Sequence, residues 1–323
     1  MNMKTFVIFF LAFAWLNQAM AQVEFDAKEK ERMANARVKT QTEWTYDFVD
    51  GKFSAKGYKS SVTKYDTRGN VTEITKTNKE GEIILIDVYQ YDNRDNRVNY
   101  ERYQGNRQKL QNSQKTVFDA NGNKIRESGF DGATMYNNTF KYDDNGKLSE
   151  INYNVENALV EKRLLKYSGN KTEISIFDAS NNLTFKQENT YNNNGMLLSE
   201  VKTGVKGNTV HTLNLQYNNT DLTEEMKIRA DNKLDYQKIY QYEGGRPIKE
   251  ETVNTDGSKF ISNEYQYNSQ GDLAFKSWRK NERAKEASTK KITYDAKGLS
   301  IEEECYWASY QLKSLYKYTY EFY

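Results

Sequence analysis

YDDNGKL, residues 142–148, is one copy of a phrase that recurs along most of this chain. The phrase consists of an aromatic residue, Asp or Asn, two variable residues, usually Gly, and then often an apolar residue. Successive copies lie about 24–27 residues apart, and a fixed period of this length is typical of a repeat architecture. The other copies begin at Tyr65, Phe118, Tyr191, Tyr267 and Tyr294, and looser copies begin at Tyr91, Tyr167, Tyr217 and Tyr242.

The segments between these phrases are predicted to form β-hairpins. A second polar break separates consecutive copies, as at Lys206-Gly207-Asn208 and Asp256-Gly257, so each unit contains two strands and two turns. Gly and Asn tolerate the positive φ of tight turns, and an Asp or Asn side chain can close a turn by hydrogen bonding to the backbone. These features favour hairpins over helices.

Aromatic residues alternate with polar residues just before several turns, as in Tyr240-Gln-Tyr242 and Tyr265-Gln-Tyr267. A period of two places aromatic and aliphatic side chains on one face of a strand and Lys, Glu, Gln and Thr on the other. We therefore expect an all-β fold, an antiparallel meander of about twenty strands over residues 44–323. Because so many strands twist, the sheet is expected to curl or spiral. A wide closed shell and two folded layers remain open as alternatives.

The first residues are predicted to form an export signal. Lys4 supplies a positive start, Phe6 to Leu16 is an apolar run, and Ala19-Met20-Ala21 has the small-x-small form of a cleavage site. The expected boundaries are a signal peptide over residues 1–21, an N-terminal segment with a short helix over 22–43, and the repeat array over 44–323. The protein is therefore expected in the periplasm, at the cell surface or outside the cell.

The composition excludes several classes of partner. The 47 Lys and Arg nearly balance the 45 Asp and Glu, and the two signs are interleaved, whereas a nucleic-acid partner requires a concentrated basic stripe. No segment after the signal is apolar enough to cross a membrane as a helix. Cys305 is the single cysteine, so no internal disulfide is expected.

The motif Tyr-Asp-x-x-Gly followed by an apolar residue resembles the YD repeat of the RHS family. It is carried by YDTRGNV from Tyr65, FDANGNK from Phe118, YDDNGKL from Tyr142 and YDAKGLS from Tyr294, and the resemblance covers roughly residues 60–300. It implies a secreted or surface-exposed protein of β-strand repeats. Large members of that family spiral their sheet into a hollow shell around a toxic C-terminal domain. The repeats of this chain are longer than typical YD repeats, and no distinct C-terminal effector domain is expected within residues 1–323.

Catalytic, metal and cofactor sites are not expected. His211 is the single histidine and is predicted to be a solvent-facing strand residue, while Cys305 is predicted to be a packed small hydrophobe. One His and one Cys cannot supply the usual four ligands of zinc. The Asp- and Asn-rich turns lack the bidentate Glu of a calcium loop. Glu recurs after the phrase, and a repeated Glu is expected to face Lys or Arg across strands and not to be a catalytic acid.

The aromatic residues give the best indication of binding. The chain has 25 Tyr and four Trp, and exposed aromatic rows suit glycans or protein partners. The predicted binding surface comprises Trp278, Trp307, Tyr265 and Tyr267. Most of the other tyrosines are expected to cover the core of a thin sheet.

The sequence thus predicts an exported, non-catalytic repeat protein that acts as a binding or structural module. Two alternatives remain. The first is a glycan-active hydrolase that uses two of the repeated Glu residues as a carboxylate pair. The second is an outer-membrane β-barrel, although counting back by twos from Tyr323 gives Glu321, Thr319 and Lys317, a polar face unsuited to lipid.

Overall fold

The computed structural model describes residues 27–323, so the expected signal peptide lies outside the described residues. A helix over residues 27–35 precedes one antiparallel sheet, and the short 3-10 helix η1 (Ala308–Tyr310) precedes the last strand. The strands are β1 (Val38–Val49), β2 (Lys52–Phe53), β3 (Tyr58–Tyr65), β4 (Val71–Thr77), β5 (Ile83–Tyr91), β6 (Arg97–Gln104), β7 (Lys109–Phe118), β8 (Lys124–Phe130), β9 (Met135–Tyr142), β10 (Leu148–Val155), β11 (Ala158–Ser168), β12 (Lys171–Asp178), β13 (Leu183–Tyr191), β14 (Leu197–Gly204), β15 (Thr209–Asn218), β16 (Asp221–Arg229), β17 (Leu234–Glu243), β18 (Arg246–Asn254), β19 (Lys259–Tyr267), β20 (Leu273–Trp278), β21 (Ser288–Tyr294), β22 (Ser300–Trp307) and β23 (Leu312–Phe322).

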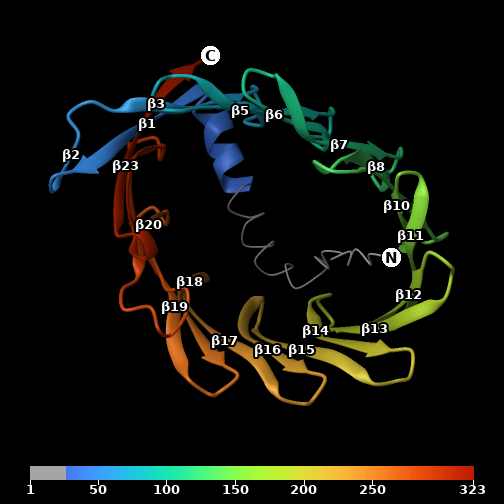
Figure 1. The fold of residues 1–323 in the computed structure, drawn as a ribbon. Helices are drawn as coiled ribbons and strands as arrows, with labels where there is room; N and C mark the ends of the chain where they lie inside the picture. Colours follow the sequence, from blue (N-terminus) through green and yellow to red (C-terminus); the bar gives the residue numbers. More distant parts are fainter. Residues whose placement is uncertain (1–26) are drawn as a thin grey trace, which may run out of the picture.

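The strands form a meander that closes on itself. From β3 onward each strand pairs antiparallel with the next, and β1 pairs with β3 on one side and with β23 on the other, while β2 pairs only with β1. The result is a 22-strand barrel, seen as a ring in Figure 1. The prediction of an all-β antiparallel meander is confirmed. The prediction of a curled or spiralling sheet is wrong, because an open sheet would leave two edges of unpaired backbone groups that the β1–β23 pairing satisfies.

The seam between the first and last strands is reinforced by side chains. Gln41 of β1 donates from Nε2 to the Tyr320 hydroxyl of β23 at 2.9 Å. The Tyr323 hydroxyl donates to the backbone carbonyl of Tyr65 at 2.6 Å, and the Tyr323 N–H donates to the carbonyl of Arg37. The C-terminus is therefore tied to both β3 and the segment between the helix and β1.

The recurring phrase forms one kind of turn. In each copy quoted above from Tyr65, Phe118, Tyr142, Tyr191, Tyr267 and Tyr294, the Asp or Asn Oδ1 accepts backbone N–H groups two and four residues later, at 2.8–3.0 Å. The Gly of the phrase has φ between 75° and 87° in these six turns, a region that favours glycine. The predicted turn closure by the Asp or Asn side chain is confirmed.

In four copies the aromatic residue of the phrase links its hairpin to the preceding one. Tyr142, Tyr167, Tyr267 and Tyr294 each donate their hydroxyl to a backbone carbonyl 18 to 21 residues earlier, at 2.8–3.0 Å. These bonds satisfy the hydroxyls of the part-buried Tyr142, Tyr267 and Tyr294 and of the more exposed Tyr167. They explain why an aromatic residue with a hydroxyl group recurs at this position.

The helix lies within the ring (Figure 1) and defines the inner face of the barrel. Met33 of the helix, Val38, Tyr65 and Leu299 form a buried cluster, so the face that carries Tyr65 points inward. The first strand begins at Val38, earlier than the expected start of the array at Trp44. The helix itself lies inside the expected N-terminal segment of residues 22–43.

The outer face carries paired charges. Lys64 precedes the inward-facing Tyr65 and therefore points outward, where its Nζ lies 2.8 Å from Glu73 Oε1. The equivalent pair before Tyr142, Lys141 and Glu150, has the same 2.8 Å distance. The expected facing of Glu with Lys across strands is confirmed for these pairs. At these positions the outer wall of the barrel is polar, while the clusters around Tyr65 and Leu213 place tyrosine and aliphatic side chains inside.

Candidate functional site

The barrel has two mouths, and successive turns of the meander lie alternately at one mouth and at the other. The turns formed by the recurring phrase lie at one mouth, which also holds the helix; we call it the helix mouth. The turns β20–β21 (residues 279–287) and β22–β23 (308–311) lie at the other, which we call the Trp mouth because β20 and β22 each end there in a tryptophan.

Trp278 and Trp307 meet at the Trp mouth. Their ring centroids lie 5.5 Å apart with an interplanar angle of 76°, an edge-to-face arrangement. The strand between them, β21, begins at Ser288, whose hydroxyl accepts the backbone N–H of Ala308 at 3.0 Å. The two residues are 29 positions apart in the sequence. They meet because β20 and β22 both pair with β21.

A hollow of about 530 Å³ opens beside this pair. Its volume lies within the range of about 300–1,000 Å³ that is usual for small-ligand sites. It is lined by the two indole rings, which we call its base, and by residues of the loops 279–287 and 308–311, which we call its walls. Tyr310 stands at its rim and is 80% exposed.

The walls of the hollow carry more free positive than free negative charge. Lys280 and Lys285 line it, and within the described residues 27–323 neither forms an ion pair. Of the two carboxylates of the loop, Glu282 pairs with Arg283 at 3.4 Å and accepts a hydrogen bond from Asn254 at 2.9 Å, whereas Glu286 lines the hollow, accepts a hydrogen bond from the Tyr306 hydroxyl and offsets one of the two lysines. The field in the hollow therefore favours an anion.

Tyr265 is connected to the hollow through a lysine. Lys276 Nζ lies 5.3 Å from the Tyr265 ring centroid and 5.8 Å from that of Trp278, distances typical of cation–π contacts. Burial lowers the pKa of Lys276. Tyr265 thus supports the floor of the site and does not line its opening.

Tyr267 lies at the other end of β19, toward the helix mouth. Its hydroxyl donates to the carbonyl of Pro247 at 2.8 Å, and the Arg246 guanidinium covers its ring at 5.7 Å. Of the four aromatic residues predicted to bind, the structure therefore brings Trp278 and Trp307 together, links Tyr265 to them, and places Tyr267 apart.

His211, which the sequence predicted to face solvent, is partly buried on the inner face of the barrel, with its side chain 24% exposed. It pairs with Lys202 across β14 and β15, and its Nε2 lies 2.9 Å from Oε1 of Glu200, a carboxylate that also accepts a hydrogen bond from Gln187. Glu200 is only 5% exposed, because Leu213 and its neighbours pack around it on the inner face. The alternation of side chains along β14 and β15 could have placed Glu200 and His211 on the same face of the sheet. It could not have shown that this face is the interior of the barrel. Cys305 is buried as predicted, and burial raises the pKa of its thiol to about 11.

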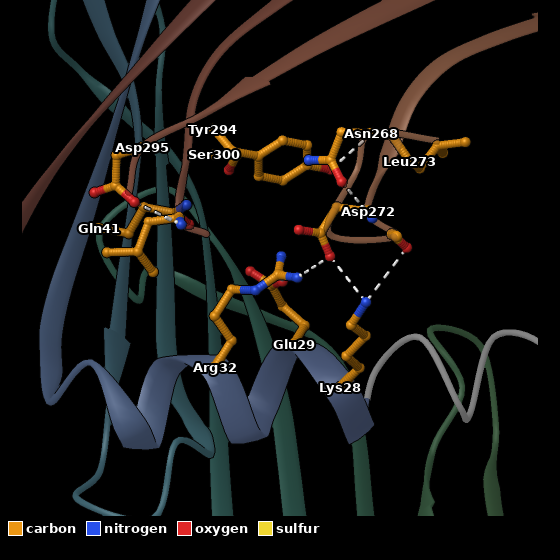
Figure 2. A network of polar contacts seen from close by, with 12 residues as sticks. Lys28, Glu29, Arg32, Gln41, Asn268, Asp272, Leu273, Tyr294, Asp295 and Ser300 are labelled. Atoms are coloured by element: carbon orange, nitrogen blue, oxygen red, sulfur yellow. Dashed lines mark hydrogen bonds and ion pairs between the residues drawn. The ribbon is translucent and has the colours of Figure 1, made fainter. Parts of the chain in front are cut away.

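A second polar site, which the sequence did not reveal, lies at the helix mouth (Figure 2). Lys28 Nζ and Arg32 Nη2 of the helix contact Asp272 Oδ1 at 2.8 and 2.5 Å, and the Asp272 side chain is 6% exposed. Burial by itself raises the pKa of Asp272, but the hydrogen bonds and charges of Lys28 and Arg32 outweigh it and hold the pKa below its usual value. On the other side of the seam, Lys30 Nζ contacts Asp95 Oδ2 at 2.9 Å.

The helix therefore connects hairpins on both sides of the seam. Gly69 of the β3–β4 turn has no room for a Cβ, which would lie 2.1 Å from the Lys30 carbonyl oxygen. Leu299 of the β21–β22 turn is fully buried under the helix. The only sequence signal for this contact is that Asp272 and Leu299 occupy a position that is Asn in three other turns, at residues 70, 96 and 123.

Within residues 27–323, no group of three or more His, Cys, Asp or Glu side chains could hold a metal ion. In the same part of the chain, no helix has the length and apolar character needed to cross a bilayer.

Comparison with known proteins gives little further guidance. No protein-family model and no curated protein matches this sequence. Among solved structures, the TcdB2-TccC3 complex, an RHS-repeat toxin complex, is 14% identical with a TM-score of 0.28, and the match covers 79% of this chain but only 19% of that one. A porin-like protein from Bacteroides uniformis is 11% identical with a TM-score of 0.32 (88% and 97% covered), and one from Bacteroides vulgatus is 10% identical with a TM-score of 0.21 (86% and 97% covered). These TM-scores are too low to establish a common fold, so the barrel rests on the strand pairing of this chain alone.

Proposed function

We propose that this protein is an exported, non-catalytic binding protein, a hollow closed β-barrel that works at the cell envelope or outside the cell. The observation that carries the proposal is the hollow at the Trp mouth, where two tryptophans meet under a loop with unpaired lysines. Aromatic residues in a concave site give contact area at a low entropic cost, which is typical of recognition surfaces.

The carboxylates of the inner face support a non-catalytic role. Glu250 accepts hydrogen bonds from Ser262 at 3.0 Å and Asn263 at 3.1 Å, and Glu200 is held by His211 and Gln187. A glycoside hydrolase needs one neutral and one ionised carboxyl group on either side of a bound sugar. Glu200 and Glu250 are buried among protein partners, and neither lines the hollow beside Trp278.

A second candidate is an outer-membrane β-barrel, and the closure of the ring favours it. Only closed barrels can place β-strands in a bilayer without unpaired edges, and an even number of strands is usual for them. The ion pairs of the outer face count against this candidate. A lysine at the bilayer midplane costs about 2–4 kcal/mol on the lipid face of a barrel, and the outer face here carries Lys64, Lys141 and Lys317.

Fractionation of cells that express the full chain separates the two candidates. The proposed function predicts that the protein is exported and is recovered without detergent in the periplasmic fraction or the culture fluid. Retention in the outer membrane after high-salt and carbonate washes, with release only by detergent, would support the membrane barrel instead. Purified protein should also be inactive on a panel of glycans; hydrolysis that a single Glu→Gln change abolishes would contradict the non-catalytic assignment.

A further inference from the structure

We infer that the hollow at the Trp mouth binds acidic polysaccharide, with sugar rings stacked on Trp278 and Trp307 and the sugar carboxylates paired with Lys280 and Lys285. The inference rests on the proposed function, because it names the ligand class of a non-catalytic binding site. It follows from three properties of the hollow: its aromatic base, its charge and its open rim.

The aromatic base suits the apolar face of a sugar ring. The face of an indole ring carries partial negative charge, which attracts the positively polarised C–H groups on one side of a pyranose. Two indoles 5.5 Å apart and nearly perpendicular form a corner, in which one sugar ring contacts both side chains. Purely aliphatic ligands would use the apolar surface but not the polar loops around it.

The charge of the walls selects an anionic ligand. The loop segment Arg279–Glu286 contains four basic residues, Arg279, Lys280, Arg283 and Lys285, and two acidic ones, Glu282 and Glu286, a net charge of +2. Glu282 already pairs with Arg283 at 3.4 Å, and Glu286, which lines the hollow, offsets only one of the two lysines there. A uronic-acid carboxylate would therefore supply the counter-charge that Lys280 and Lys285 lack within the described residues.

The shape of the site favours a chain of sugars over other anions. A hollow of about 530 Å³ holds a few sugar residues, and the 80% exposed Tyr310 at its rim extends the aromatic surface in one direction. Nucleic acid would need a basic stripe much longer than this single loop, whereas the other charges of the chain form mixed pairs. A linear polysaccharide requires only one short charged and aromatic subsite.

The test is isothermal titration of the chain over residues 22–323 with hexamers of galacturonate, mannuronate and chondroitin, each at low and at 0.3 M salt. The methyl-esterified galacturonate hexamer is the matched uncharged probe. We expect at least one acidic hexamer to bind, the ester to bind about tenfold more weakly, and salt to weaken binding of the acid. The absence of binding by all three acidic hexamers would overturn the inference.

Variants locate the site. Trp307→Ala and the double change Lys280→Gln with Lys285→Gln should each weaken binding about tenfold, and Trp307→Phe should retain most of it. The control is Lys206→Gln with Lys233→Gln, which removes two exposed lysines from other turns of the same mouth and should leave affinity unchanged. Equal binding by all variants would place the ligand elsewhere and contradict the inference, while an exported, detergent-free protein would leave the proposed function intact.

Discussion

The two mouths of the barrel are built from turns of the same sheet but have opposite properties. At the helix mouth, the four turns that contact the helix over residues 27–35 are each five residues long, and they meet it through Gly69, Asp95, Asp272 and Leu299. At the Trp mouth the turns range from two residues (156–157) to nine (279–287), and Tyr310 is exposed. Uniform turns can share one partner, whereas irregular turns form a recess. We therefore assign stability to the helix mouth and recognition to the Trp mouth.

The largest predicted effect comes from the buried cluster under the helix. Met33→Ala removes a side chain that is 1% exposed, so it should lower the free energy of unfolding by about 3–4 kcal/mol in urea titration. The matched change at the Trp mouth, Leu312→Ala, affects a 49% exposed residue and should cost less than about 1 kcal/mol. Equal losses from the two changes would remove the distinction between the mouths.

The second-largest effect is predicted for Asp272, the carboxylate that pairs with Lys28 and Arg32 of the helix. Asp272→Asn removes one of the two counter-ions of the partly buried Arg32, the other being Glu29 at 3.1 Å, and should cost about 2 kcal/mol at pH 7. The folded-state pKa of Asp272 is lowered, so its stabilisation is complete above the unfolded pKa of about 4 and is lost as the pH falls through the folded pKa. Urea titrations at pH 7 and pH 3 should therefore show a smaller difference between wild type and variant at pH 3. A difference that is unchanged at pH 3 would show that the ionised form of Asp272 does not stabilise the helix contact.

Two glycines in equivalent turns separate the cost of a clash with the helix from the cost of backbone strain. Gly69 and Gly146 occupy the same place in two turns, with φ of 79° and 75°, but a Cβ meets the helix backbone at Gly69 and nothing within 4 Å at Gly146. Gly146→Ala should cost about 1 kcal/mol from strain alone, and Gly69→Ala should cost at least about 1 kcal/mol more. Thermal denaturation of both variants measures the difference. Similar melting temperatures would mean that the helix does not pack on the β3–β4 turn.

The smallest effect is predicted for the outer face. Glu73→Gln breaks the contacts with Lys64 and Arg107, and exposed ion pairs contribute about 0.2–1 kcal/mol, so the loss in urea titration should stay below about 1 kcal/mol. High salt should reduce the difference further. A loss of several kcal/mol would show that these ion pairs of the outer face are shielded from water.

The sequence revealed the local elements of this fold but not their closure. The phrase at Tyr142 predicts its turn because the Asp side chain, the Gly φ and the aromatic residue act within one hairpin. Closure depends on the summed twist of many strands and on the pairing of Val38–Val49 with Leu312–Phe322, which no local pattern encodes. For the same reason Trp278 and Trp307 could be named from their residue type, while Lys280, Lys285 and the inward position of His211 required the structure.

The most direct test of the closed barrel is a cross-link over its seam. Thr42 and Thr319 are cross-strand partners in β1 and β23, and directly opposed Cα atoms lie about 4.5–5.5 Å apart, within the range of a disulfide. In a Cys305→Ser background, Thr42→Cys with Thr319→Cys should oxidise to an intramolecular disulfide seen by non-reducing electrophoresis and peptide mass spectrometry. Thr42→Cys with Thr203→Cys is the control that should not react. Efficient cross-linking of the seam pair alone is the predicted result, and its failure in a folded protein would contradict the closed 22-strand barrel.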